Sequence, residues 1–270
     1  MNKRVDEALA DWRAPFADKA HSWERIQMRI AAQDHPVVHT RSRRFRYAAV
    51  AIGLVLIASV LFLFQNGDSM YSTQMAEIQV LTLPDGSEVT LNAATELRFD
   101  EADFLEERTL ELDGEAFFQV EKGSRFSVVT DQGTISVLGT SFNVCDRGDF
   151  LEVICSTGKV RVDDGRQSFV LTPGQSVDNL AGRLTQGTAD TDAAPWIRGV
   201  FRFEDRPLGH VMEEMERQFG VTITTEDVGE RFFTGEFESA DLESALTVIC
   251  RPLGLDYTIS DNGQIRVTNR

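Results

Sequence analysis

Residues 112–144 read LDGEAFFQVEKGSRFSVVTDQGTISVLGTSFNV. Short runs of β-branched and aromatic residues alternate here with turn residues, of which Lys122-Gly123 and Gln132-Gly133 are the clearest. Such runs, at intervals of roughly 8–12 residues, are typical of the strands of a β-sandwich or barrel. This stretch therefore predicts consecutive strands joined by tight turns.

The same pattern extends in both directions, with further turns at Pro84-Asp85-Gly86 and Asp164-Gly165. Because no long helical pattern interrupts it, we predict an all-β, sandwich-like domain over residues 77–180. The strands expected in this domain are Ile78–Leu83, Val89–Leu91, Thr109–Leu112, Ala116–Val120, Phe126–Val129, Ile135–Leu138, Phe142–Cys145, Leu151–Cys155, Val160–Val162 and Phe169–Leu171.

A second, smaller domain is predicted after residue 195. Residues 181–195 (AGRLTQGTADTDAAP) lack large apolar residues apart from Leu184 and are rich in Gly, Thr and Asp, which indicates a linker. Apolar residues then recur at helical spacing over 207–219 and again over 242–249. Over residues 196–270 we therefore predict a small α+β domain, with two helices packed on small sheets. Its expected strands are 200–203, 221–224, 232–237, 255–259 and 265–267.

The most apolar segment of the chain is Tyr47–Phe64 (YAAVAIGLVLIASVLFLF), which carries no charge and no proline. As a helix it would be roughly 27 Å long, close to the ~30 Å hydrocarbon core of a bilayer. A cleaved signal peptide is the alternative, but its apolar region would be shorter and nearer the N-terminus. We therefore predict a single-pass membrane protein. The arginines that precede the span place the N-terminus in the cytoplasm and the C-terminus in the periplasm by the positive-inside rule: Arg41, Arg43, Arg44 and Arg46.

Two short amphipathic helices are predicted before the span, separated and ended by Pro15 and Pro36. Their apolar residues are too few to form a core of their own, so they must pack on something else. A protein partner is the favoured occupant, and the inner leaflet of the membrane is the alternative. The predicted docking face consists of Val5, Leu9, Trp12, Phe16, Trp23, Ile26 and Ile30.

The charge balance changes across the span. Residues 1–46 contain 10 Lys or Arg and 6 Asp or Glu, whereas the remainder contains 17 and 37. A strongly acidic exterior argues against binding of nucleic acid or of an anionic membrane surface. It is compatible with a basic partner or a cation, or simply with solubility.

The cysteines do not form a recognisable disulfide or metal pattern. Cys145, Cys155 and Cys250 are odd in number and show no CxxC spacing. A hairpin turn centred on 146–149 places Cys145 opposite about Leu151 rather than Cys155, so buried free thiols are expected.

Catalytic motifs are also missing. Only His210 of the four histidines follows the span, which leaves no imidazole pair for a zinc site or a triad. No metal, cofactor or enzymatic activity is therefore expected. One dipeptide, Gly139-Thr140, admits two interpretations. A strained turn could let the Thr140 hydroxyl attack the Gly139 carbonyl, which gives an ester that water then cleaves. The pair could instead simply form a turn or bulge, and this interpretation is favoured.

Several long motifs resemble the FecR-type membrane regulators. LPDGSEVTLNAATELRF (83–99), the stretch 112–144, STGKVRV (156–162) and LTPGQ (171–175) are similar to the periplasmic β-domain of that family. The tail, through WIRGVFRFEDRPLGHVMEEMERQFGVTI (196–223), FTGEF (233–237) and LESALTVICRPLGLDYTI (242–259), is similar to the family's C-terminal domain, which in turn resembles the N-terminal module of secretins and TonB-dependent proteins.

The resemblance implies an anti-sigma factor of the bacterial inner membrane. Its cytoplasmic end would hold an ECF (extracytoplasmic-function) sigma factor. Its periplasmic part would receive a signal from the signalling domain of an outer-membrane TonB-dependent transporter, so that transcription of iron or glycan uptake genes is controlled. Regulatory proteases are possible further partners. The alternative is a periplasmic sensor or scaffold that does not bind a sigma factor.

The organisation expected from sequence and resemblance together has six parts. These are a cytoplasmic sigma-docking segment (1–44), a transmembrane helix (45–65), a linker (66–76), a FecR-like β-domain (77–180), a second linker (181–195) and the α+β domain (196–270). The cytoplasmic segment is shorter than the multi-helix segment expected of the family.

Overall fold

The computed structural model describes residues 19–32, 52–56, 68–180, 182–238, 240–260 and 263–270. The chain divides into two units, residues 1–63 and 64–270. In the first unit, helix α2 spans Lys19–Ala32, and residues 52–56 are also helical. Within the described ranges, no helix combines the length and the apolar character needed to cross a bilayer. The predicted span at 47–64 lies mostly outside those ranges.

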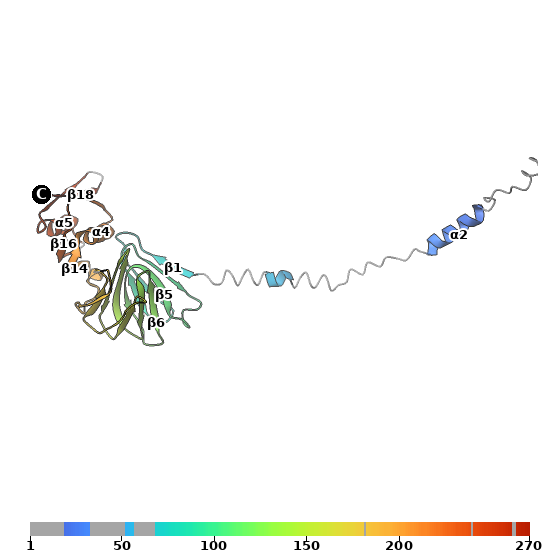
Figure 1. The fold of residues 1–270 in the computed structure, drawn as a ribbon, viewed down its shortest axis with the longest axis horizontal. Helices are drawn as coiled ribbons and strands as arrows, with labels where there is room; N and C mark the ends of the chain where they lie inside the picture. The colour runs from blue at the N-terminus through green and yellow to red at the C-terminus, as the bar shows by residue number, and fades with distance from the viewer. Residues whose placement is uncertain (1–18, 33–51, 57–67, 181, 239, 261–262) are drawn as a thin grey trace, which may run out of the picture. The chain divides into compact units, whose positions relative to one another are not determined.

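The second unit is mostly β, with a small α+β part at its C-terminal end (Figure 1). We name its first part, residues 68–188, the β-domain. The strands of the β-domain are β1 (Asp68–Ser72), β2 (Gln79–Thr82), β3 (Glu88–Leu91), β4 (Glu96–Asp100), β5 (Thr109–Gln119), β6 (Phe126–Thr130), β7 (Gly133–Val137), β8 (Ser141–Arg147), β9 (Phe150–Cys155), β10 (Val160–Asp163), β11 (Ser168–Leu171), β12 (Gln175–Asp178) and β13 (Thr185–Thr188).

Strand β5 connects the two layers of the β-domain. Its first half pairs with β4 and in parallel with β6, and its second half pairs with β3 and β8. The path through the sheet is β11-β10-β7-β6-β5-β8-β9-β12-β13. Gly114 lies where β5 changes partners, with φ +124°, and a Cβ there would lie 2.6 Å from Oγ1 and 2.7 Å from Cα of Thr95. A strand that switches sheets in this way forms the corner of a sandwich, and here only glycine fits the corner.

The core lies between the two layers. Side chains on β5 alternate between outer and buried positions along its whole length, so the two strands expected at Thr109–Leu112 and Ala116–Val120 form one continuous strand. Phe118 stacks on Phe142 with ring centroids 5.1 Å apart and meets Phe126 edge-on at 6.2 Å. All three rings are fully buried, so aromatic packing supplies much of the apolar contact of this domain.

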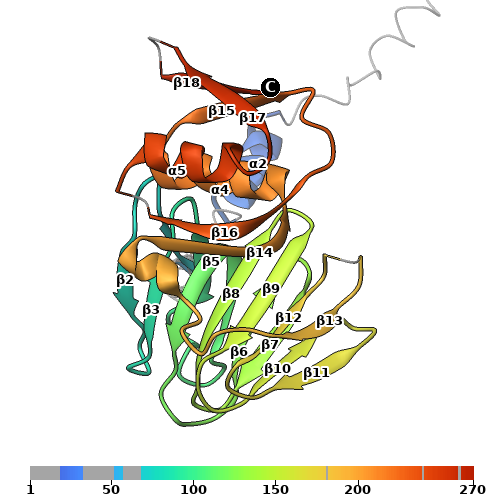
Figure 2. The ribbon, with the colours of Figure 1, turned by 90° about the vertical axis from the view of Figure 1, so that its left-hand side faces the viewer.

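The remainder of the unit, residues 195–270, is the C-terminal domain. Figure 2 shows α4 and α5 lying between the β14–β16 pair and the β15-β18-β17 sheet. Its elements are the 3-10 helix η1 (Pro195–Arg198), β14 (Val200–Pro207), α4 (Leu208–Phe219), β15 (Thr222–Glu226), β16 (Phe232–Glu238), α5 (Leu242–Cys250), β17 (Leu255–Ile259) and β18 (Gln264–Asn269).

Local signals mark the ends of the helices well. Gly220 caps α4 in the left-handed region with φ +63°, and Asp241 caps α5 by accepting a hydrogen bond from the backbone N–H of Glu243. Pro207 is the last residue of β14 and the N-cap of α4, one position before the helix it was expected to begin.

The two expected linkers both contain strands. β1 falls within 66–76 and pairs with β4, and β13 falls within 181–195 and pairs with β12. β1 and β13 each hydrogen-bond to a single neighbouring strand, so each forms an edge of the sheet and does not need the apolar alternation of an inner strand. β4 and β12 were also not expected from the sequence.

The cysteine expectation is confirmed in part. All three thiols are free, and Cys155 and Cys250 are buried, but Cys145 is partly exposed. The register of the hairpin is one residue away from the expected one, because Cys145 faces Glu152 and Asp146 faces Leu151.

Candidate functional site

The predicted sigma-docking face falls largely outside the described residues. Val5, Leu9, Trp12 and Phe16 lie in residues 1–18, and the side chains of Trp23 and Ile30 in α2 are not described. Ile26 is described and is 45% exposed, as a docking residue must be before its partner binds. The arginines expected to set the topology also lie outside the described ranges.

The Gly139-Thr140 pair joins β7 to β8. Gly139 has φ +144°, and a Cβ there would lie 2.8 Å from the Cα of Lys122, so the close approach of two backbones requires glycine. Thr140 is only 4% exposed, and its hydroxyl donates a hydrogen bond to the carbonyl of Lys159 at 3.2 Å. A hydroxyl held in this way is a structural turn residue. To attack the Gly139 carbonyl it would have to leave the Lys159 carbonyl first.

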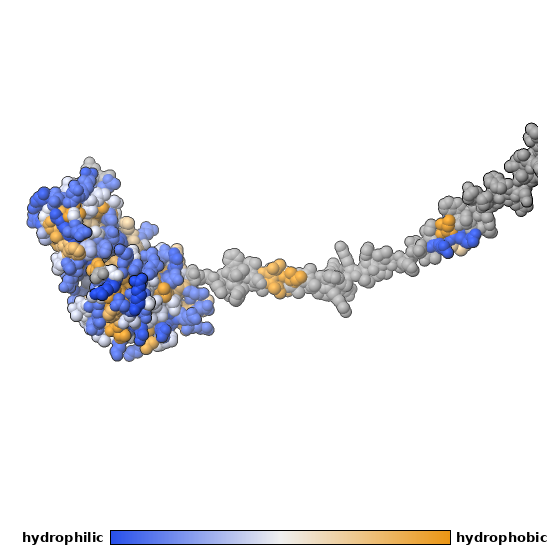
Figure 3. Space-filling model, in the orientation of Figure 1, coloured by the Kyte–Doolittle hydropathy of each residue, from blue (hydrophilic) through white to orange (hydrophobic). Residues whose placement is uncertain are grey.

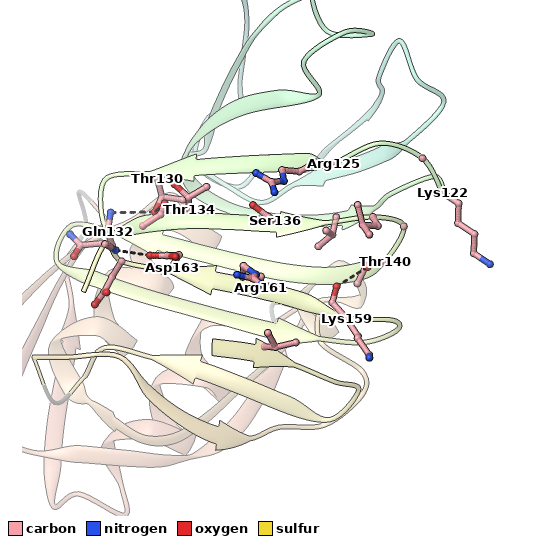
Figure 4. A pocket seen from close by; sticks show the side chains of 18 of the residues that line it. Lys122, Arg125, Thr130, Gln132, Thr134, Ser136, Thr140, Lys159, Arg161 and Asp163 are labelled. Carbon is pink, nitrogen blue, oxygen red and sulfur yellow. Dashed lines mark hydrogen bonds between the residues drawn. The ribbon is translucent and has the colours of Figure 1, made fainter. Parts of the chain in front are cut away.

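A groove of about 1280 Å³ begins at this turn and runs over the outer face of β6, β7, β10 and β11. In Figure 4 Thr140 lies at one end between Lys122 and Lys159, while Arg125, Ser136 and Arg161 lie near the middle. Asp163 and Gln132 lie at the opposite end. The groove was not predicted, because it is lined by two strand pairs, β6–β7 and β10–β11, that are distant from each other in sequence.

A polar network joins the β-domain to the C-terminal domain. Asn143 on β8 is almost fully buried, and its amide donates to Oε1 of Glu115 at 2.8 Å. The side-chain oxygen of Asn143 accepts a hydrogen bond from the indole N–H of Trp196 at 3.2 Å. Phe117, on the same strand as Glu115, packs against the core of the C-terminal domain. The two domains thus share both apolar and polar contacts.

The network continues from Glu115 to α4. Its second carboxylate oxygen accepts from Asn92 at 2.7 Å, and the oxygen of Asn92 accepts from Gln218 at 2.8 Å. Gln218 also donates to Glu214 at 2.8 Å. Two carboxylates, Glu115 and Glu214, are therefore linked through neutral amides within the interface.

The network changes the pKa of the Glu115 carboxyl. Burial, followed by the charge of Glu214, raises the pKa of the Glu115 carboxyl to about 7, although the hydrogen bonds from Asn143 and Asn92 and the charge of Arg147 act to lower it. This carboxyl therefore changes its protonation near neutral pH.

A cavity of about 540 Å³ lies beside this network, between the two domains. Arg206 lies over the ring of Phe150, 4.0 Å from its centroid, and donates to Glu152 at 2.8 Å. Nε and one terminal nitrogen of Arg206, and Nδ1 of His210, are buried without a hydrogen-bond partner among the described residues. His210 is half-buried, and its ring centroid lies 5.5 Å from that of Phe150.

Sequence reasoning missed the interface residues. One signal was present: Asn143 stands among apolar residues in a strand, where asparagine is disfavoured unless its amide is satisfied. The partner, Trp196, could not be identified, because pairing over such a sequence separation depends on how the domains pack.

Comparison with known proteins agrees with this architecture. The FecR protein family model matches residues 69–161, and the FecR C-terminal model matches residues 200–267. Two crystal structures of a proposed anti-sigma factor from Parabacteroides distasonis have the same fold, each with 29% sequence identity and a TM-score of 0.71. The first match covers 76% of this chain and 100% of the other, and the second covers 75% and 99%. No curated protein matches the sequence. Both FecR parts are present, in order and packed together, and the chain belongs to the FecR family.

Proposed function

We propose that this protein is a single-pass anti-sigma factor of the bacterial inner membrane. Its N-terminal segment holds an ECF sigma factor in the cytoplasm. Its β-domain and C-terminal domain lie in the periplasm and receive a signal from the signalling domain of a TonB-dependent transporter. The output is control of uptake genes, and no catalytic step is needed.

One observation carries the proposal. The FecR and FecR C-terminal parts form one packed unit, and the match covers the whole crystallised chain of a proposed anti-sigma factor from Parabacteroides distasonis. A regulator of this kind needs a receiving domain, a connection through the membrane and a docking segment. Three parts of the chain fit these roles. The acidic unit after residue 66 fits the receiving domain, the apolar stretch 47–64 fits the connection through the membrane, and helix α2 fits the docking segment.

The surface of the folded unit supports a role in protein recognition rather than in membrane insertion. The face seen in Figure 3 is mostly hydrophilic, with hydrophobic residues in small separate patches. The C-terminal domain has two edge strands, β15 and β17, on either side of β18. A strand of a partner protein could pair with either of them.

The test is capture of a sigma factor by the full chain. The protein, purified in detergent micelles, is mixed in turn with each ECF sigma factor encoded by its source organism. Binding of one of them supports the proposal. Ile26→Ala is expected to weaken that binding, whereas Met28→Ala, about 200° away around α2, is the matched control.

A different outcome would identify the alternative function. If no sigma factor binds, but a periplasmic protein co-purifies through residues 68–270, the protein is a sensor or scaffold. Equal loss of sigma binding in the Ile26 and Met28 variants would remove the predicted docking face while leaving the anti-sigma role intact.

A further inference from the structure

The groove on the β-domain has a charge pattern opposite to that of the domain around it. The part of the chain after residue 66 contains only two lysines, Lys122 and Lys159, and both line this groove. Arg125 and Arg161 line it as well. Four cations therefore converge on one face of a unit in which acidic residues outnumber basic ones about two to one.

Within the part of the chain that the structure describes, these four cations have no charged or hydrogen-bonding partner for their side chains. Among the described residues, none of them forms an ion pair or donates a side-chain hydrogen bond to another protein group. In contrast, Arg108 and Arg206 bind carboxylates inside the same unit. Gathering free cations raises the local potential, and this favours an anionic occupant.

The order of charges along β10 and the residue before it, Lys159, further restricts which kind of partner can bind in the groove. Lys159 and Arg161 are exposed while Val160 and Val162 are buried, so the two cations share one face, about 7 Å apart. Asp163 follows on that same face and is only partly exposed. The outer face of this segment therefore presents two positive charges, on Lys159 and Arg161, followed by one negative charge, on Asp163.

The residues that face Arg161 and Asp163 on the neighbouring strand β7 are small, so the groove is open over these two side chains. Arg161 lies opposite Ser136 on β7, and Asp163 lies opposite Thr134. These short hydroxyl side chains leave room for an incoming chain and offer it hydrogen bonds. Val170 on β11, opposite Arg161 on the other side, is 50% exposed and offers an apolar contact.

The carboxylates at one end make a uniform polyanion a poor fit. Asp131, Asp163 and Asp164 would repel a nucleic acid or an anionic lipid surface, and no aromatic ring lines the groove for base stacking. An extended peptide can instead present alternating side chains of both signs at the spacing of a strand.

From this charge row and its open groove, we propose that the outer face of β6, β7, β10 and β11 binds an extended, carboxylate-rich segment of a partner protein. Two acidic residues at positions i and i+2 lie on Lys159 and Arg161, and a basic residue at i+4 lies on Asp163. This binding is independent of the sigma-factor role, because it uses the β-domain alone.

The test uses two fluorescein-labelled peptides with the full chain in detergent micelles. The probe is acetyl-Ser-Glu-Val-Glu-Val-Lys-Ser-amide, and the control is the charge-inverted acetyl-Ser-Lys-Val-Lys-Val-Glu-Ser-amide. At low salt, about 50 mM, anisotropy should show the probe binding at least about fivefold more tightly than the control. Added salt should weaken the binding.

Variants locate the site. Lys159→Glu combined with Arg161→Glu should reduce probe binding by roughly tenfold or more, since two charge pairs become repulsions. Arg161→Lys should retain most of it. Arg183→Glu, an exposed reversal of a single charge outside the groove, is the control for general charge effects and should leave binding unchanged.

Three results of the peptide experiments would each overturn the proposal: no probe binding at millimolar concentration, equal binding of probe and control, or loss of binding in the Arg183 variant as large as in the double variant.

Vesicles of phosphatidylcholine with phosphatidylglycerol provide a separate comparison. Binding to them that depends on Lys159 and Arg161 and exceeds probe binding would assign the groove to an anionic lipid surface instead. A circular dichroism spectrum confirms that each variant is folded.

Discussion

The indole nitrogen of Trp196, the second residue of η1, donates a hydrogen bond to the side-chain oxygen of Asn143 in the middle of β8, 3.2 Å away. Both side chains are buried, at 4% and 2% exposure. This hydrogen bond connects the first turn of the C-terminal domain to the β-domain. It also orients the Asn143 amide toward Glu115, at the centre of the interface.

Removing the indole N–H is the first prediction. Trp196→Phe keeps a buried ring but leaves the Asn143 oxygen without its donor, so the free energy of unfolding should fall by about 1–3 kcal/mol. Trp196→Ala should cost more, about 3–5 kcal/mol, because it also empties part of the core. Urea unfolding measures both. Ile197→Ala, at the exposed neighbouring position, is the control and should change stability by less than about 1 kcal/mol.

The second prediction concerns pH. The pKa of Glu115 is raised from 4.5 to about 7 in the folded protein, mainly by burial, so between these values the folded state binds more protons than the unfolded state. The contribution of Glu115 to stability should therefore be complete at and below about pH 4.5 and should be lost as the pH rises through about 7. Burial raises the pKa of Asp146 from 3.8 to about 6, which acts in the same direction.

Variants separate the contribution of Glu115 from general charge effects. Glu115→Gln should flatten the decline in melting temperature between about pH 5 and 7, whereas Glu111→Gln, exposed on the same strand, should leave it in place. An unchanged pH profile in the Glu115 variant would show that this carboxyl does not link protonation to stability.

The third prediction tests the docking face. If the sigma factor binds the predicted face, Trp12→Ala or Trp23→Ala should weaken binding by roughly 2 kcal/mol or more, because buried aromatics commonly dominate interfaces. Isothermal titration with the full chain in detergent measures the change. Unaltered affinity in both variants would exclude these tryptophans from the interface.

The fourth prediction concerns the receiving domain. A chain ending at residue 194 should remain anchored but no longer respond to the transporter, because the edge strands of the C-terminal domain are lost. The truncation begins after β13, since removing 181–270 would also strip a strand from β12. A reporter gene under the sigma factor measures the response, and Trp196→Ala serves as a control for interface damage alone. A normal response in the truncated chain would place the receiving surface on the β-domain.

The fifth prediction tests cleavage at Gly139-Thr140. Self-cleavage would yield fragments of 139 and 131 residues, as counted from the sequence. Thr140→Ala would abolish them and Thr140→Ser would retain them, because the serine hydroxyl can still attack the Gly139 carbonyl. The hydrogen bond from Thr140 to the Lys159 carbonyl favours an intact chain. An immunoblot distinguishes the cases, and fragments that persist in Thr140→Ala would point to an external protease.

The sequence alone determined the structural class of each part after the apolar stretch 47–64. The alternation along residues 112–144 predicted strands there, and the change to helical spacing after residue 206 predicted α4. These patterns are local, because a residue two or four positions away decides which side chains share the buried face. Gly220 as a cap and the hairpin at Gly148 follow from local backbone preferences as well.

Tertiary structure alone decided what these elements do together. The sequence does not distinguish the edge strands β1 and β13 from linkers, because an edge strand needs apolar residues at few of its positions. The pairing of Trp196 with Asn143, the protonation of Glu115 and the meeting of Arg125 with Arg161 in one groove all depend on strand register and domain packing. Arg125 and Arg161 are 36 positions apart, Trp196 and Asn143 are 53 apart, and Glu115 and Glu214 are 99 apart. The buried polar groups among them are removed from water and depend on partners that other parts of the fold supply, and no local sequence pattern shows which groups become partners.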